Sequence, residues 1–224
     1  MSTSSKLRLV TLGLVLAALT AFVNPPASAA GPAGRQRPNA VRTASRFVTY
    51  RVFATQYRPN TRGSIEVAVP DQCAKFASLG LTSALRSANC PAGYRLGLNY
   101  KVRVRNTASG KVLAIRVKDV GPWNEDDNYW DGLRGPRPRR RFGRLHRGTP
   151  EAQAAFYNGF HTVSNCLTLS NQPSGHSGAA DQFGRCVLNP AGIDLSFAAA
   201  RRLGFSTGQN GWVTVQFLWE PRRT

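Results

Sequence analysis

The chain has 224 residues and a formal net charge of +19, and 42% of its residues are hydrophobic. This length suffices for one domain with its own core. After residue 23, no run reaches the 18 or so apolar residues of a membrane helix, which excludes a spanning protein. So strong a positive charge predicts attraction to polyanions, with solubility alone as the alternative explanation.

Residues 1–30 predict a secretory signal peptide. Lys6 and Arg8 precede an apolar run over 9–23, and the small residues ASA at 27–29 form a cleavage motif. We expect cleavage at about residue 30, which removes Lys6 and Arg8 and lowers the net charge to +17. The protein is then secreted and extracellular, and we expect it to associate with the cell wall.

The next residues predict a linker and then the start of the domain, which we place at 46–220. Residues 31–45 are rich in Gly, Pro, Ala and Arg and are expected to form a disordered basic linker. The β-branched and aromatic segments RFVTYRVFATQY (46–57) and SIEVAV (64–69) predict strands. DQCAKFASLG (71–80) predicts one or two helical turns that end at its glycine.

A β-hairpin is expected next. YKVRVRN (100–106) alternates between apolar and polar residues, the turn NTASG follows, and KVLAIRVKDV (111–120) returns as a second strand. The second strand leads into a carboxylate, a Gly-Pro turn and Trp123. This arrangement is either a rigid corner at the end of the strand or one wall of a binding cleft.

Residues 124–189 are expected to be a loop-rich insertion. NEDDNYWD (124–131) predicts a solvated acidic loop that pairs with the basic run after it, since it lacks the spacing of a calcium loop. Thr149, followed by Pro150 and Glu151, predicts a capped helix that continues to about residue 160. We expect the basic run to bind anions without contributing to the fold. Its seven arginines are Arg134, Arg137, Arg139, Arg140, Arg141, Arg144 and Arg147.

The last elements are a short helix and a strand. Ser196 is expected to cap a helix over 197–203 that ends at Gly204, and GWVTVQFLWE (211–220) predicts the closing strand. Strands dominate and no regular β-α alternation occurs. The sequence therefore predicts a mainly β fold, a small barrel with short helices.

Four cysteines, Cys73, Cys90, Cys166 and Cys186, predict two disulfides in an exported chain. Three pairings can be drawn, and we expect the pairing of sequence neighbours, Cys73 with Cys90 and Cys166 with Cys186. Each closes a short loop and is worth about 3 kcal/mol in the chain-entropy model.

Two segments, KDVGPW (118–123) and GIDLSFAAARRLG (192–204), and more weakly FATQY (53–57), resemble the rare lipoprotein A and expansin families. The resemblance covers most of residues 46–220 and implies a six-stranded double-psi β-barrel with a groove for a polysaccharide. Expansins carry a second, aromatic-faced domain, and we expect this chain to lack it because little sequence follows Glu220.

The resemblance also implies site residues. Asp194 matches the acid of the Asp-Leu-Ser motif, and Asp119 matches the acid at the end of the preceding strand. Both are candidate catalytic residues. Thr55 is expected in the groove. The candidates for stacking against sugar rings are Tyr57, Trp123 and Trp130.

The residues alone allow the same chemistry. Glycoside cleavage needs an acid to protonate the leaving oxygen, and the apolar neighbours of Asp194 favour a raised pKa. Hydrolysis usually needs a second carboxylate, a role that Asp119 can fill, whereas a lytic transglycosylase needs only one acid. The alternatives are structural: Asp194 favouring a helix end, Asp119 binding turn amides and Trp123 packing at a corner.

We therefore expect a monomeric protein that binds peptidoglycan or another wall polysaccharide and anionic wall polymers, with weak lytic transglycosylase activity as a further expectation. One alternative is a secreted protease inhibitor or interaction protein on the same barrel, and another is a cationic antimicrobial protein. No nucleic-acid-binding motif is present, so we expect no nucleic acid partner. The three histidines share no ligand spacing and no C-x-x-C occurs, so we expect neither metal nor cofactor. The histidines, expected at the surface, are His146, His161 and His176.

Overall fold

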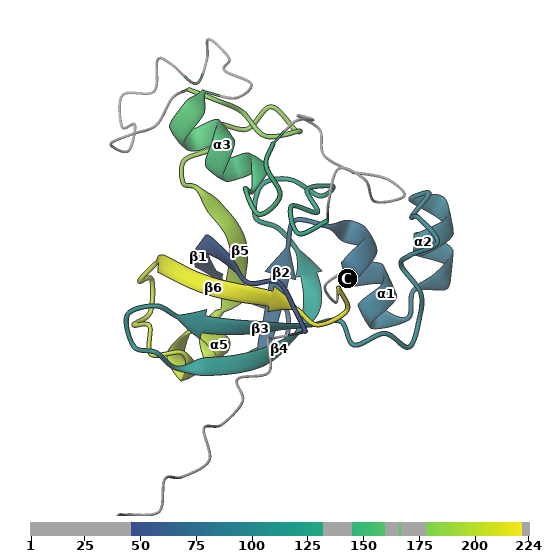
Figure 1. Cartoon of the computed structure of the whole chain (residues 1–224), viewed down its shortest axis with the longest axis horizontal. Helices are drawn as coiled ribbons and strands as arrows, with labels where there is room; N and C mark the ends of the chain where they lie inside the picture. The colour runs from purple at the N-terminus through teal and green to yellow at the C-terminus, as the bar shows by residue number, and fades with distance from the viewer. Residues whose placement is uncertain (1–45, 132–144, 160–165, 167–177, 221–224) are drawn as a thin grey trace, which may run out of the picture. The chain divides into compact units, whose positions relative to one another are not determined.

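The computed structural model describes residues 46–131, 145–159, 166 and 178–220. Six strands in these ranges close into a barrel with the order β1-β5-β2-β4-β3-β6 (Figure 1). The expected mainly β fold with a six-stranded barrel and short helices is confirmed, and its double-psi connectivity stays a prediction. The strands are β1 (Tyr50–Tyr57), β2 (Glu66–Val69), β3 (Lys101–Asn106), β4 (Val112–Val120), β5 (Ala191–Ser196) and β6 (Gly211–Phe217).

Alternation of side chains along the strands builds the core of the barrel. In β3 every second residue is buried, and the hydrophobic pattern of the sequence matches this face. In β5, Ile193 and Leu195 are almost fully buried, so the residue between them, Asp194, is directed to the outer face. β5 was not among the strands predicted from the residues, because AGIDLS is short and runs directly into a helix.

The pairing of the strands is mixed. β1–β5 and β2–β4 are parallel, and β2–β5, β3–β4, β1–β6 and β3–β6 are antiparallel. The expected hairpin is confirmed as β3–β4, with Val102 opposite Ile115. The register of β2–β4 shifts between Val67 and Ala68, which places Ala68 opposite Asp119.

Two of the short helices agree closely with the sequence. α1 (Gln72–Leu79) begins at Asp71, whose carboxylate accepts bonds from two backbone N–H groups, and it ends at Gly80 in the left-handed conformation. α5 (Phe197–Arg202) begins at Ser196, whose hydroxyl accepts from the Ala199 N–H. The predictions of both helices are confirmed.

Two further helices within the described ranges depart from the sequence predictions. α2 (Thr82–Ser87) was not predicted and has no side-chain cap. α3 (Glu151–Asn158) lies where a helix was expected, but its cap position is Pro150, which offers no side-chain acceptor. The predicted Thr149 cap is wrong, because the carboxylate of Asp127 instead accepts from the Glu151 N–H at 2.6 Å.

Both predicted disulfides are confirmed. Cys73–Cys90 links α1 to the segment after α2, with 5.7 Å between Cα atoms. Cys166–Cys186 joins two parts of the insertion, with 5.4 Å between Cα atoms. Such bonds are typical of proteins that fold in an oxidising compartment.

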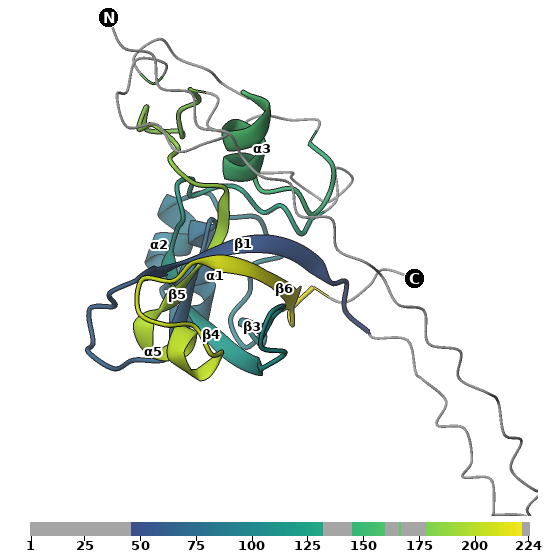
Figure 2. The ribbon, with the colours of Figure 1, turned by 90° about the vertical axis from the view of Figure 1, so that its left-hand side faces the viewer.

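The insertion has a small apolar cluster of its own. It consists of Ala152, Ala155, Phe156, Ala179 and Val187, and partly buried Trp123 packs against it. In Figures 1 and 2, α3 lies beyond the end of the barrel from which β5 begins.

The expected solvated acidic loop over 124–131 is not solvated. Asn124, Asp127 and Asn128 are each at most 2% exposed. Their oxygens serve backbone groups of the insertion: Asn124 accepts from the Gln182 N–H at 2.9 Å, as Asp127 does from that of Glu151. Burial of these polar groups is compensated by such bonds, which periodicity cannot reveal.

Several predictions fall on residues outside the described ranges. They are the signal peptide, the linker over 31–45, six of the seven arginines (134, 137, 139, 140, 141 and 144), His161 and His176. His146 is exposed, as expected. No helix in the described ranges is long and apolar enough to cross a membrane. In those same ranges, no group of three or more His, Cys, Asp or Glu side chains is arranged to hold a metal.

Candidate functional site

Four residues on four adjacent strands form a row across the outer face of the barrel. Thr55 in β1 pairs with Asp194 in β5, which pairs with Ala68 in β2, which pairs with Asp119 in β4. Residues that pair directly share a face of the sheet. The two acids therefore lie two strand spacings apart, about 10 Å between Cα atoms, with only a methyl group between them.

Asp194 is the chemically distinctive member of this row. Its carboxylate accepts a hydrogen bond from the Thr55 hydroxyl. Burial raises the pKa of Asp194 to about 6, the Thr55 bond opposes this rise, and the charge of Asp119 adds to it. Asp194 thus has the proton affinity of a general acid near neutral pH.

The turn after β4 lies directly against this carboxylate. A Cβ atom at Gly121 would lie 3.3 Å from Asp194 Oδ2, and Gly121 has a φ of +138°. Glycine is therefore required here both for the backbone conformation and for the close approach. The turn of KDVGPW and the acid of GIDLS, 73 residues apart in sequence, form one site.

Two adjoining hollows, of 560 and 370 Å³, open around Asp194, and we call them together the groove. Both are lined by Asp194, Pro122, Trp123 and Arg185. The larger hollow is also lined by hydroxyl, amide and aromatic side chains, and its size is that of a ligand site. These residues are Thr55, Gln56, Asn189, Asn210 and Phe197.

Trp123 both packs and faces the groove, so the two interpretations of this residue hold together. Its ring packs against the cluster of the insertion, and its indole N–H donates to Asn189 Oδ1 at 3.1 Å. The same side chain lines both hollows. The packing fixes the ring in place, which suits a stacking surface.

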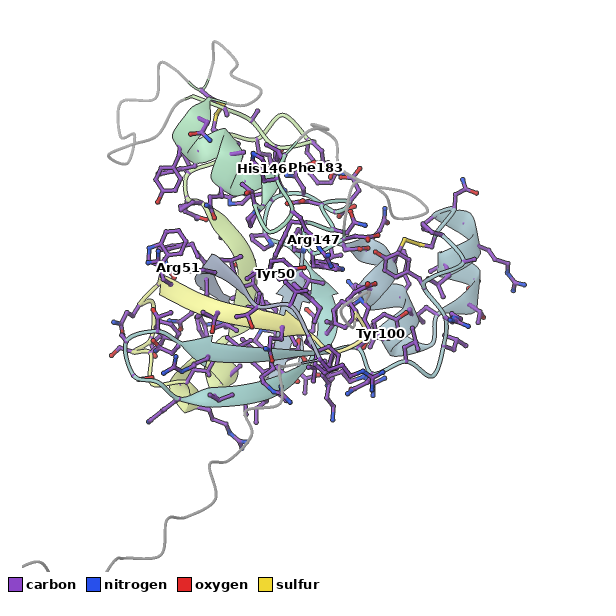
Figure 3. The ribbon with its side chains drawn as sticks, viewed as in Figure 1. Tyr50, Arg51, Tyr100, His146, Arg147 and Phe183 are labelled. Carbon is purple, nitrogen blue, oxygen red and sulfur yellow. A yellow bond between two sulfur atoms is a disulfide. The ribbon has the colours of Figure 1, made fainter. Side chains whose placement is uncertain are left out.

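Arg185 is held on the same wall. Its Nε donates to Asp181 at 2.6 Å, its Nη2 donates to the Trp123 carbonyl at 2.9 Å, and its guanidinium lies 4.9 Å from the centre of the Phe183 ring. Figure 3 shows Phe183 in the insertion. The Arg185 side chain remains 60% exposed, so this fixed cation is accessible to a ligand.

Asp119 is placed differently from Asp194. Its carboxylate forms an ion pair with Lys75 at 2.8 Å and accepts from the Val120 N–H at 2.9 Å. It is not among the described residues that line the groove. The structural role considered from sequence, binding turn amides, is therefore present.

The remaining aromatic candidates do not stack in the groove. Trp130 is 0% exposed and stacks on Phe217 with centroids 4.0 Å apart, so its predicted sugar contact is wrong. It was misplaced because an aromatic residue in a polar segment suggests exposure. Tyr57 lines neither hollow, and its hydroxyl donates to Glu66 at 3.1 Å. Burial, and then the Glu66 charge, raises the pKa of Tyr57, so it remains a hydrogen-bond donor.

Arg147 is the one arginine of the predicted anion-binding run within the described residues. Its Nε donates to the Trp130 carbonyl at 2.6 Å, and its guanidinium lies 5.9 Å from the centre of the Tyr50 ring (Figure 3). These contacts fix the start of the segment that leads to α3. Anion binding by the run as a whole stays a prediction.

Sequence reasoning missed Arg185, Asn189 and Phe197 as groove residues. A signal existed for Arg185, because it precedes Cys186 and a residue next to a disulfide has a restricted position. Phe197 is the first residue of α5, so the direction of its side chain depends on where the helix begins, which the sequence alone does not determine. For Asn189, no local pattern indicates the groove.

Comparison with protein-family models matches residues 48–216 to a domain of unknown function, DUF8814. The match covers about three quarters of the chain and includes all residues of the groove. No curated protein and no solved structure gives a match.

Proposed function

The chain belongs to the family defined by the domain of unknown function DUF8814, and from this premise we propose that its groove binds a wall polysaccharide and cleaves it as a lytic transglycosylase. One observation supports this above the others: a carboxyl group with a pKa of about 6 lies in a groove between a fixed tryptophan and neutral polar side chains. A flat aromatic ring suits the C–H face of a sugar, and amide and hydroxyl groups suit its hydroxyls.

Asp194 acts first as an acid and then as a base. Its proton passes to the glycosidic oxygen as the bond between that oxygen and the anomeric carbon breaks. A hydroxyl of the same sugar attacks the anomeric carbon, and the proton of that hydroxyl returns to Asp194. The products are an anhydro-sugar end and a free hydroxyl, so no water is consumed.

One-acid chemistry is proposed here rather than hydrolysis by Asp194 and Asp119, and the other carboxylate among the described groove residues, that of Glu125, lines only the smaller hollow. Asp119 is bound to Lys75 and does not line the groove, whereas Asp194 does. A hydrolase needs its second carboxylate beside the scissile bond, as nucleophile or as base for water. Asp119 instead acts at a distance, because its charge helps to keep Asp194 protonated.

Other features support export and a wall polymer as the substrate. The first 30 residues have the pattern of a signal peptide, the chain is strongly basic, and the structure contains two disulfides. The resemblance of KDVGPW and GIDLSFAAARRLG to the rare lipoprotein A and expansin families points the same way. Specificity for peptidoglycan is part of the proposal.

The test is incubation of the mature protein with purified peptidoglycan, followed by mass spectrometry of the soluble products. We expect fragments with anhydro-sugar ends. Asp194→Asn keeps the shape of the side chain but removes its proton, and should lower the rate by at least about 10²-fold. Asp119→Asn is the matched control and should retain most of the activity, since Asp119 does not line the groove.

The pH dependence gives an independent check. The general acid must be protonated, so the rate should fall by about tenfold per pH unit above about pH 6, the pKa of Asp194. A decline that begins near pH 4 would contradict the raised pKa. Binding without any product would leave a wall-binding protein, and tight inhibition of a protease would favour the inhibitor alternative.

Stability measurements distinguish loss of chemistry from loss of fold. A carboxyl whose pKa is raised in the folded state ionises at higher pH there than in the unfolded chain. Asp194 therefore lowers stability as pH rises from about 4 to about 6, by on the order of 1–2 kcal/mol after allowance for its partial exposure. Asp194→Asn removes this cost, so at pH 7 the inactive variant should be at least as stable as the native protein.

A further inference from the structure

A third hollow, of 640 Å³, lies beside the groove and differs from it in charge. Three arginines line it, Arg58 and Arg62 from the turn after β1 and Arg201 from α5. Its other described lining residues include no carboxylate. We call this site the basic hollow.

The three guanidinium groups are available to a ligand. All three arginines are exposed, and no hydrogen bond or ion pair of their side chains occurs within the described residues. The nearest acid along the turn is Glu66, whose carboxylate is already held by Ser64, Tyr57 and, at 3.7 Å, Lys118. The positive charge of the hollow is thus not neutralised by the surrounding described chain.

The hollow is built on a fixed framework. The Ser196 hydroxyl donates to the Ser64 carbonyl at 2.7 Å and accepts from the Glu66 N–H at 3.2 Å, which ties the turn to the start of α5. On α5, Phe197 and Arg201 are four residues apart and therefore lie on one face of the helix. The arginines are held around one space rather than scattered over the surface.

Phe197 connects the basic hollow with the groove, because it lines both. It follows Asp194 by three residues, so the two Cα atoms lie at most about 10 Å apart. A polymer strand in the groove can therefore reach the arginines without leaving the surface of the protein.

We propose that the basic hollow binds an oxyanion, a carboxylate or a phosphate, carried by the same wall polymer whose sugar units lie in the groove; the choice of polymer rests on the proposed function. Guanidinium groups bind such oxyanions through paired hydrogen bonds. The groove then recognises the sugar, and the three arginines of the basic hollow, together with the one cation Arg185 among the described groove residues, favour acidic polymers over neutral ones.

The experiment is calorimetric titration of the mature protein with three wall-type probes and, for comparison, a DNA oligomer. Chitohexaose is a neutral glycan, a peptide-free peptidoglycan hexasaccharide carries lactyl carboxylates, and a glycerol-phosphate oligomer supplies phosphate without sugar. We expect the hexasaccharide to bind about tenfold or more tightly than chitohexaose. If the glycerol-phosphate oligomer binds and a variant of the three arginines loses that binding, phosphate is a ligand. If the oligomer does not bind, the ligand is the carboxylate.

The triple variant Arg58→Gln/Arg62→Gln/Arg201→Gln should lose the preference for the acidic probes and keep its affinity for chitohexaose. The matched control is Arg86→Gln/Arg95→Gln/Arg202→Gln, which removes the same charge from exposed arginines that do not line the hollow. It should retain the preference. Thermal melting should be nearly unchanged in both variants, because all six positions are exposed.

Equal affinity of the native protein for the hexasaccharide and chitohexaose would overturn the inference while leaving the groove intact. Equal losses in the two triple variants would also overturn it, since attraction would then be a property of overall charge. A DNA oligomer that binds more tightly than either acidic wall probe would overturn the assignment of the polymer. If neither glycan binds, but the glycerol-phosphate oligomer binds and the triple variant loses that binding, the hollow stands and the proposed function fails.

Discussion

The barrel and the insertion are stabilised in different ways, although both line the groove. In the barrel, alternate apolar side chains such as Val102 and Val215 form one continuous core. In the insertion, the apolar cluster is small, and buried polar groups such as those of Asn124, Asp127 and Asp181 hold backbone N–H groups. In the barrel, hydrogen bonds between strands pair most backbone groups, and side chains such as Ser196, which accepts from the Glu66 N–H, add bonds at strand ends.

The two regions of the groove are therefore held in place by different interactions. The acid and Thr55 lie on paired strands of the barrel, and Arg185 and Asn189 come from the insertion. A change that loosens the insertion should therefore alter the wall of the groove and leave the acid in place. Three sets of substitutions distinguish these interactions, in order of decreasing effect.

The two disulfides should act on different regions. Cys73→Ala/Cys90→Ala should lower the free energy of unfolding by about 3 kcal/mol, measured by urea denaturation, because the bond restricts the unfolded chain. Cys166→Ala/Cys186→Ala should act locally: amides of α3 should exchange faster with deuterium, and those of β3 and β6 should remain protected. Unchanged protection of α3 would show that hydrogen bonds alone hold the insertion.

Gly192→Ala should destabilise the contact between the two regions. The new Cβ would lie 2.4 Å from Pro150 Cγ and 3.2 Å from Val52 Cβ, so the start of α3 or the strand must move. We expect a loss of about 2 kcal/mol in urea denaturation. Gly93→Ala is the matched control, with no atom within 4 Å of its Cβ and an ordinary backbone conformation. Equal free energies of unfolding for the two variants would mean that the chain accommodates the new Cβ atom without a loss of stability.

Asp127→Ala should cost about 1 kcal/mol through loss of the cap of α3. The comparison is with Thr149→Ala, at the position that the sequence favours as a cap. A smaller loss for Thr149→Ala in thermal melting supports capping by Asp127. A larger loss for Thr149→Ala would indicate that Thr149 caps α3 and would contradict capping by Asp127.

Much of the barrel was predictable because its signals are local. The alternation in 100–106, the turn and the return strand define β3–β4, and Ser196 and Gly204 bound α5 within a residue or two. The disulfides followed from cysteine spacing. β5 was missed because a six-residue strand that runs into a helix has little room to show a period.

The site was predictable only in part, and the reason lies in distance along the chain. Asp194, Thr55 and Trp123 were identified by resemblance, and all three line the groove. The burial of Trp130, the Lys75–Asp119 ion pair and the position of Arg185 depend on contacts between segments far apart in sequence. Local patterns carry no information about such contacts.

The position of Asp194 on a strand with a partner on each side links it to the register of the barrel. A slip of one residue would send Asp194 into the core and bring Ile193 or Leu195 to the surface. The acid is thus tied to the barrel fold itself, whereas Arg185 and Asn189 line the groove from outside the paired strands. A mutant library confined to these two positions would therefore sample new specificities around an unmoved proton donor.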